Sequence, residues 1–126
     1  NMKLRSVKID KKFIPQFNGN RLLPTSEQMV IYFTRIPGTS EKSNYKDYKF
    51  DSKGGVQLVY NDQLLVSTFI EKIENLEIEI DGKTQQIKNG VELAAANNSK
   101  LSELFTEIRN YLFPEGDELE EGELKA

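Results

Sequence analysis

The sequence contains neither cysteine nor histidine among its 126 residues. Their absence excludes disulfides, thiolate nucleophiles, zinc sites of the usual type and the imidazole base that works at neutral pH. Long hydrophobic runs are also missing, because no stretch approaches the roughly 20 apolar residues of a membrane-spanning helix. No apolar signal segment lies near the start, so we expect a cytoplasmic protein without a membrane partner.

Catalytic and cofactor motifs are missing as well. The sequence has no phosphate-binding glycine loop, no nucleophile elbow and no calcium-binding loop. Four aspartates, Asp47, Asp51, Asp62 and Asp81, are scattered without the spacing of metal ligands. We therefore expect no catalytic residues, no cofactor and no metal, and we do not expect an enzyme.

What is present is the composition of one polar globular domain. Hydrophobic residues make up 37% of the chain and charged residues 29%, which is compatible with a packed core. The formal net charge of -3 does not favour nucleic acid or an acidic membrane as a partner. We expect a single α+β domain over residues 1–113, mostly an antiparallel sheet with hairpins, packed by C-terminal helices. A flexible acidic tail is expected over residues 114–126.

The two ends differ in charge. The segment KLRSVKI near the start places Val7 and Ile9 on one alternate face, which is typical of a strand, among several lysines and arginines. Those charges could blunt an edge strand or form a nucleic-acid-binding arm. The tail PEGDELEEGELKA holds six acids and one lysine. Because it cannot order itself alone, it either stays solvated or folds on a basic partner through Leu119 and Leu124.

The stretch IPQFNGNRLLPTSEQMVIYF predicts a connection followed by a strand. Pro15 and Pro24 each fix φ and remove a hydrogen-bond donor, and Asn18-Gly19 is a turn signal. We expect an ordered connection over residues 15–25. The continuous apolar run after it predicts a long strand over residues 27–36, buried on both faces.

Further strands and turns are expected downstream. Residues 39–44 are polar and predict a loop, and short strands are expected around residues 45–50 and over residues 56–60. The segment LEIEIDGKTQQI predicts a hairpin, because Asp81-Gly82 supplies the positive φ values of a two-residue turn. Glu77 and Glu79 share one face of this hairpin, and we interpret them as its solvent face rather than as paired catalytic acids.

Helical spacing occurs in three places. Leu65, Phe69, Ile73 and Leu76 predict a helix over about residues 62–74 after a cap at Asn61 or Asp62, with a strand over residues 64–70 as the alternative. Residues 91–97 predict a short helix. A longer amphipathic helix over residues 99–112 has an apolar face that either packs on the sheet or binds a partner. That face contains Leu101, Leu104, Phe105, Ile108 and Leu112.

Three segments, in this order, resemble the tail assembly chaperones of long-tailed bacteriophages and prophages. They are FIPQFNGNRLLPTSEQMVIYF, then IEKIENLEIEIDGKTQQIKNGVEL, then KLSELFTEIRNYLF with the polar ending ELEEGELK. None is a catalytic fingerprint, and the resemblance rests on their order and spacing. It covers about half the chain, and the stretch 37–55 lies outside it.

The resemblance implies a non-enzymatic role in the host cytoplasm. Such proteins bind the long helical tape-measure protein, keep it soluble and help recruit tail-tube subunits, and many also exist in a frameshift-extended form. A chaperone role predicts exposed apolar surface on a polar fold. The candidate partner-binding residues are Leu101, Leu104, Phe105, Ile108, Leu112, Leu119 and Leu124, and a homo-oligomer is compatible with them.

Two other functions remain open. A structural virion component, of the tail-tube or head–tail connector type, would form stable rings. A small nucleic-acid-binding protein would use Lys8, Lys11 and Lys12 and would bind with strong salt dependence.

Overall fold

The computed structural model describes residues 9–96 and 98–114 and confirms the expected α+β class. The expected strand at the N-terminus falls almost entirely outside these residues, and so does the acidic tail after Pro114. The 3₁₀ helices are labelled η. The elements, in chain order, are β1 (Lys12–Phe13), η1 (Phe17–Leu22), η2 (Thr25–Glu27), β2 (Val30–Phe33), η3 (Thr39–Tyr45), β3 (Lys46–Phe50), β4 (Val56–Tyr60), α1 (Asp62–Phe69), β5 (Ile70–Glu74), β6 (Glu77–Ile80), β7 (Lys83–Gln86), α2 (Gly90–Ala96), η4 (Ser99–Leu101) and α3 (Ser102–Leu112).

The central sheet has three antiparallel strands in the order β1–β2–β5. Phe13, Ile31 and Ile73 lie side by side across it and are buried in the core. Tyr32 points to the other face and is half-buried, with Lys72 Nζ 5.6 Å from the centre of its ring. The strand is shorter than the expected residues 27–36. Val30 is buried on the same face as Tyr32, so both faces of β2 are at least partly covered, as expected.

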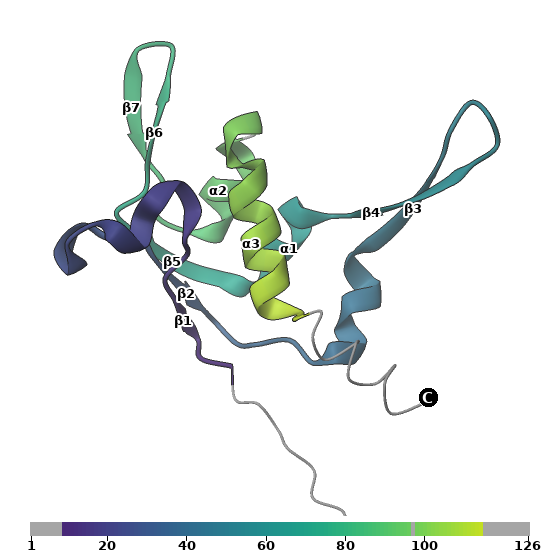
Figure 1. Cartoon of the computed structure of the whole chain (residues 1–126), viewed down its shortest axis with the longest axis horizontal. Coiled ribbons are helices and arrows are strands. Elements are labelled where there is room, and N and C mark those ends of the chain that lie inside the picture. The colour runs from purple at the N-terminus through teal and green to yellow at the C-terminus, as the bar shows by residue number, and fades with distance from the viewer. Residues whose placement is uncertain (1–8, 97, 115–126) are drawn as a thin grey trace, which may run out of the picture.

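The three α-helices and this sheet enclose one hydrophobic core (Figure 1). Leu104, Ile108 and Leu112 of α3 are at most 2% exposed. Tyr111 stacks on Phe13 with ring centres 4.1 Å apart, which ties α3 to the edge strand β1. The buried residues of α3 recur at helical spacing, so the apolar face that predicted the helix is also the face that packs on the core.

The expected helix over residues 62–74 is two elements. Asn61 Oδ1 accepts a hydrogen bond from the backbone N–H of Leu64 at 3.1 Å and caps α1. The helix ends at Phe69, and β5 follows directly with an extended backbone at Ile70. Leu65, Phe69 and Ile73 all reach the same core from the two elements, so apolar spacing alone did not separate helix from strand.

The second helix depends on close approach to the first. Asn89 Oδ1 accepts from the backbone N–H of Glu92 at 2.9 Å, so Asn89-Gly90 begins α2 instead of forming a separate turn. A Cβ at Gly90 would lie 2.1 Å from the carbonyl oxygen of Val66 and 2.9 Å from Ile70 Cβ. Only glycine lets α2 approach α1 this closely.

Two two-stranded hairpins, β3–β4 and β6–β7, project from the body (Figure 1). The predicted turn of β6–β7 is confirmed, since Asp81 and Gly82 have φ values of 52° and 77°. Strand β4 has the expected bounds, Val56–Tyr60. The expected polar loop before β3 is instead the 3₁₀ helix η3.

The predicted connection before β2 is ordered by one buried side chain, Asn20. The side-chain amide of Asn20 donates to the carbonyl oxygens of Pro15 at 2.8 Å and Met29 at 3.0 Å. Its Oδ1 accepts from the backbone N–H of Met29 at 2.6 Å. The left-handed residues Asn18 and Gly19, with φ values of 50° and 71°, turn the chain so that Asn20 reaches these groups. We call residues 14–29 the opening segment.

We expect Asn20→Asp to lower the free energy of unfolding by about 3 kcal/mol. A carboxylate cannot donate to the two carbonyl oxygens and would be buried beside them. Asn18→Asp is the control, because Asn18 is exposed and the same charge is introduced two residues away. Urea denaturation of both variants measures the effect. Equal stability of the two would show that the Asn20 contacts do not order the segment.

Candidate protein-binding surface

Exposed apolar side chains gather on hairpin β3–β4. Tyr48, Phe50, Val56 and Leu58 are 63%, 78%, 59% and 43% exposed. Directly paired residues of an antiparallel hairpin share a face, and so do residues two apart along a strand. The register pairs Tyr48 with Leu58 and Phe50 with Val56, so all four lie on one face, which we call the hairpin face.

The other side of the same hairpin is mostly polar, apart from the half-buried Val59, which pairs with Asp47 near the base. Asp47, Lys49 and Gln57 alternate with the apolar residues and point the opposite way. The tip is a tight turn in which Asp51 Oδ1 accepts from the backbone N–H groups of Lys53 at 2.8 Å and Gly55 at 2.7 Å. The hairpin thus presents one apolar and one mostly polar face at the surface.

Aromatic contacts at the base of the hairpin fix it to the core. Tyr45, just before β3, is buried and packs edge-on to Phe69 with ring centres 5.6 Å apart. Tyr60, at the end of β4, lies under Arg109 of α3, whose Cζ is 4.3 Å from the ring centre. Arg109 Nη1 also donates to Asp62 at 2.8 Å, and burial raises the pKa of Asp62 in spite of this partner.

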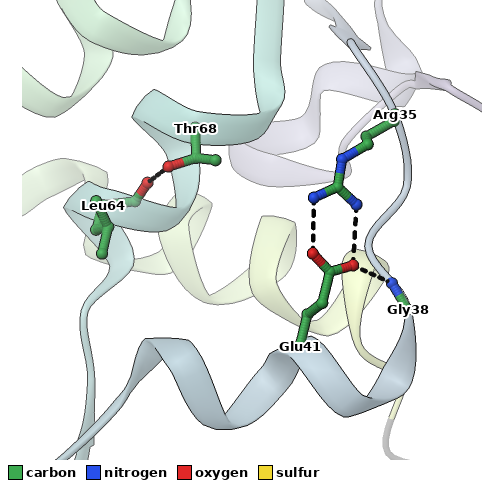
Figure 2. A network of polar contacts seen from close by, with 5 residues as sticks. All are labelled: Arg35, Gly38, Glu41, Leu64 and Thr68. Atoms are coloured by element: carbon green, nitrogen blue, oxygen red, sulfur yellow. Dashed lines mark hydrogen bonds and ion pairs between the residues drawn. The ribbon is translucent and has the colours of Figure 1, made fainter.

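An ion pair holds the segment that leads into β3 (Figure 2). Arg35 donates through both terminal nitrogens to Glu41, at 2.9 Å and 2.6 Å, and the backbone N–H of Gly38 donates to the same carboxylate at 2.6 Å. Arg35 Cζ also lies 5.0 Å from the centre of the Phe69 ring. These contacts place η3, and therefore the hairpin after it, against the end of α1.

The predicted apolar face of residues 99–112 is formed by Leu101 of η4 and by four residues of α3. Leu101, Leu104, Ile108 and Leu112 belong to the hydrophobic core, so the packing alternative describes this face. Phe105 is half-buried and lines a shallow groove with Tyr60 at the base of the hairpin. The two tail candidates, Leu119 and Leu124, lie outside the described residues.

The hairpin face was missed although its strands were expected. The alternation of Tyr48 with Phe50, and of Val56 with Leu58, is the pattern of a strand with one covered face. Nothing in that pattern says whether another element of the chain covers it. In the structure none of these four side chains is buried, which only the three-dimensional arrangement could reveal.

Other kinds of site find no support among the residues that the structure describes. They contain no group of acidic residues placed to hold a metal ion. No helix within 9–96 and 98–114 is long and apolar enough to span a membrane. Comparisons with protein-family models, curated proteins and solved structures found no significant match to the chain.

We expect Glu41 to make stability depend on acid pH. The hydrogen bonds from Arg35 and then from Gly38 lower the pKa of Glu41 from 4.5 to about 2. A depressed carboxyl pKa contributes stability that is present above about pH 4.5 and is lost as the pH falls towards 2.

Glu41→Gln should therefore lose less stability than the wild type between these pH values. Thermal melts at a series of pH values measure this, and Glu71→Gln is the control for removing one exposed carboxylate. An unchanged acid profile in Glu41→Gln would contradict the role given to the ion pair.

Proposed function

We propose that the chain is a non-enzymatic tail assembly chaperone of a phage or prophage, which binds its partner through the hairpin face. The observation that carries this proposal is a set of four exposed apolar side chains on one side of a projecting hairpin. A chaperone for apolar protein segments needs such a surface. The resemblance of the three sequence segments supplies the family.

The shape of the surface suits a long helical partner. The two-stranded sheet offers an apolar strip of aromatic and aliphatic residues, on which the apolar stripe of a helix can lie. Full burial of a large apolar side chain contributes roughly 1.5–3 kcal/mol, and part of this is offset by the cost of association. Four partly exposed side chains thus give a contact that can be released, as a chaperone requires.

In this proposal the partner is a tape-measure protein, bound in the bacterial cytoplasm and kept soluble until tail-tube subunits assemble on it. The chain contributes contact surface and no chemistry. Residues Phe105 and Tyr60 extend the surface at the base of the hairpin, so that one of the α3 candidates keeps a place in the interface.

A nucleic-acid function is the second candidate. Lys46, Lys49 and Lys53 alternate with Tyr48 and Phe50 along the hairpin, which is a pattern that stacks bases and contacts phosphates. Asp47 and Asp51 lie among them and oppose it. The basic residues 8, 11 and 12 favoured this function from sequence, but only the last two are described, and both are exposed.

Paired variants of one hairpin test the proposal. Tyr48→Thr/Phe50→Thr removes aromatic surface and introduces β-branched residues, which favour strands, so the strand should persist. Lys49→Thr/Gln57→Thr makes matched changes on the opposite face. Both variants should unfold within about 1 kcal/mol of the wild type, because all four side chains are exposed.

We expect the tagged wild-type chain to retain a long helical protein from phage-producing cells. The Tyr48→Thr/Phe50→Thr variant should retain at least tenfold less of it. The Lys49→Thr/Gln57→Thr variant should retain it. Large rings made only of this chain would favour a virion component. Salt-sensitive binding to single-stranded DNA, lost in the lysine variant, would favour the second candidate.

A further inference from the structure

A second groove, of about 350 Å³, lies between β6 and the opening segment. Met29, Leu76, Ile78 and Leu101 form its apolar floor, and Phe17 and Leu23 add apolar surface. Of the two strands of this hairpin, β6 contributes Glu77, Ile78 and Glu79 to the lining, and β7 contributes none of the described lining residues. The groove therefore runs along the edge of β6 that faces away from its partner strand.

That edge has unpaired backbone groups. The backbone N–H of Ile87 donates to the carbonyl oxygen of Leu76 at 2.8 Å, and bonded and non-bonded pairs alternate along an antiparallel hairpin. Glu77 and Glu79 consequently direct their N–H and C=O groups away from β7. Within the described part of the chain, no other strand pairs with β6.

The groove is also acidic. Glu27, Glu77 and Glu79 line it against a single cation, Lys100, and the three glutamates are exposed. On β6, Glu77 and Glu79 point to one face while Ile78 points to the other and is buried. A strand added to this edge would meet negative charge on one face and apolar surface on the opposite face.

The far wall of the groove is held in place. The side-chain amide of Asn75 donates to the carbonyl oxygens of Ser26 at 3.1 Å and Gln28 at 2.9 Å. Asn75 lies just before β6, so these bonds fix the spacing between the strand and the opening segment. The groove is thus formed before anything occupies it, which reduces the entropic cost of binding.

We propose that this groove takes residues 2–5 of a second copy of the chain, added as a strand to β6. In the sequence MKLR, Lys3 and Arg5 alternate with Met2 and Leu4. An added strand places both cations beside Glu77 and Glu79 and both apolar side chains on the face of Ile78. The four residues match the length of β6, Glu77–Ile80.

The described chain begins at the end of the central sheet that lies away from the groove. The backbone carbonyl oxygen of Lys11 accepts a hydrogen bond from the N–H of Phe33 at one end of β2, and Ile9 is the first residue that the structure describes. Glu74, which precedes β6, pairs with Val30 at the other end of β2. Reciprocal strand exchange between two copies gives a closed dimer.

Sedimentation of the full chain from about 1 to 300 µM tests the proposal, since a contact of this size associates in that range. We expect concentration-dependent self-association that weakens with added salt. Lys3→Glu/Arg5→Glu should weaken it at least tenfold, and so should Glu77→Lys/Glu79→Lys. The four substitutions together should restore it to within about threefold, because each charge again faces its opposite.

Two controls make the result specific. Lys49→Glu/Lys53→Glu makes the same change in net charge on the other hairpin and should leave self-association unchanged. Tyr48→Thr/Phe50→Thr should also leave it unchanged, which separates this groove from the hairpin face. A monomer at every concentration, charge variants that associate like the wild type, or loss only in the aromatic variant would each overturn the proposal.

Discussion

Two strands cannot bury an apolar face between them, and this constraint governs which apolar side chains of the two hairpins stay exposed. A two-stranded sheet is marginally stable alone and needs a further layer. In β6–β7 that layer is the core, which takes Leu76 and Ile78. In β3–β4 only the flanking Tyr45 is buried, and the four apolar residues of the hairpin face stay exposed. The difference between the hairpins is therefore a difference in what remains for a partner to cover.

The rest of the fold serves to hold these hairpins in place. The pair of Arg35 and Glu41 fixes the segment before β3, and Arg109 joins Tyr60 to the start of α1. The buried amide of Asn20 orders the opening segment by donating to the carbonyl oxygen of Pro15. The exposed amide of Asn75 joins the start of β6 to that segment by donating to the carbonyl oxygen of Gln28. Polar side chains that bond to backbone groups thus order the loops, while the core supplies most of the stability.

Local signals in the sequence predicted those elements whose conformation is set locally. The φ values demanded at Asp81 and Gly82 made the β6–β7 turn predictable, and the 3.6-residue period made α3 predictable. Long-range packing decided the rest. Ile73 fits a helical period yet lies in β5, because its side chain can reach the core from a strand as well as from a helix. Amphipathic spacing favoured packing of Leu104 on the sheet but left a partner-binding face open. Alternation at Tyr48 and Phe50 could not show that their face is uncovered.

The central claim is that the hairpin face is where the partner binds. Photo-crosslinking in phage-producing cells tests it most directly, with a benzophenone amino acid at position 50 and, as comparison, at position 49. The two side chains are neighbours on β3 but point to opposite faces. The account predicts a crosslink to a long helical tail protein from position 50 and none from position 49. Equal crosslinking from both, or none from position 50, would contradict it.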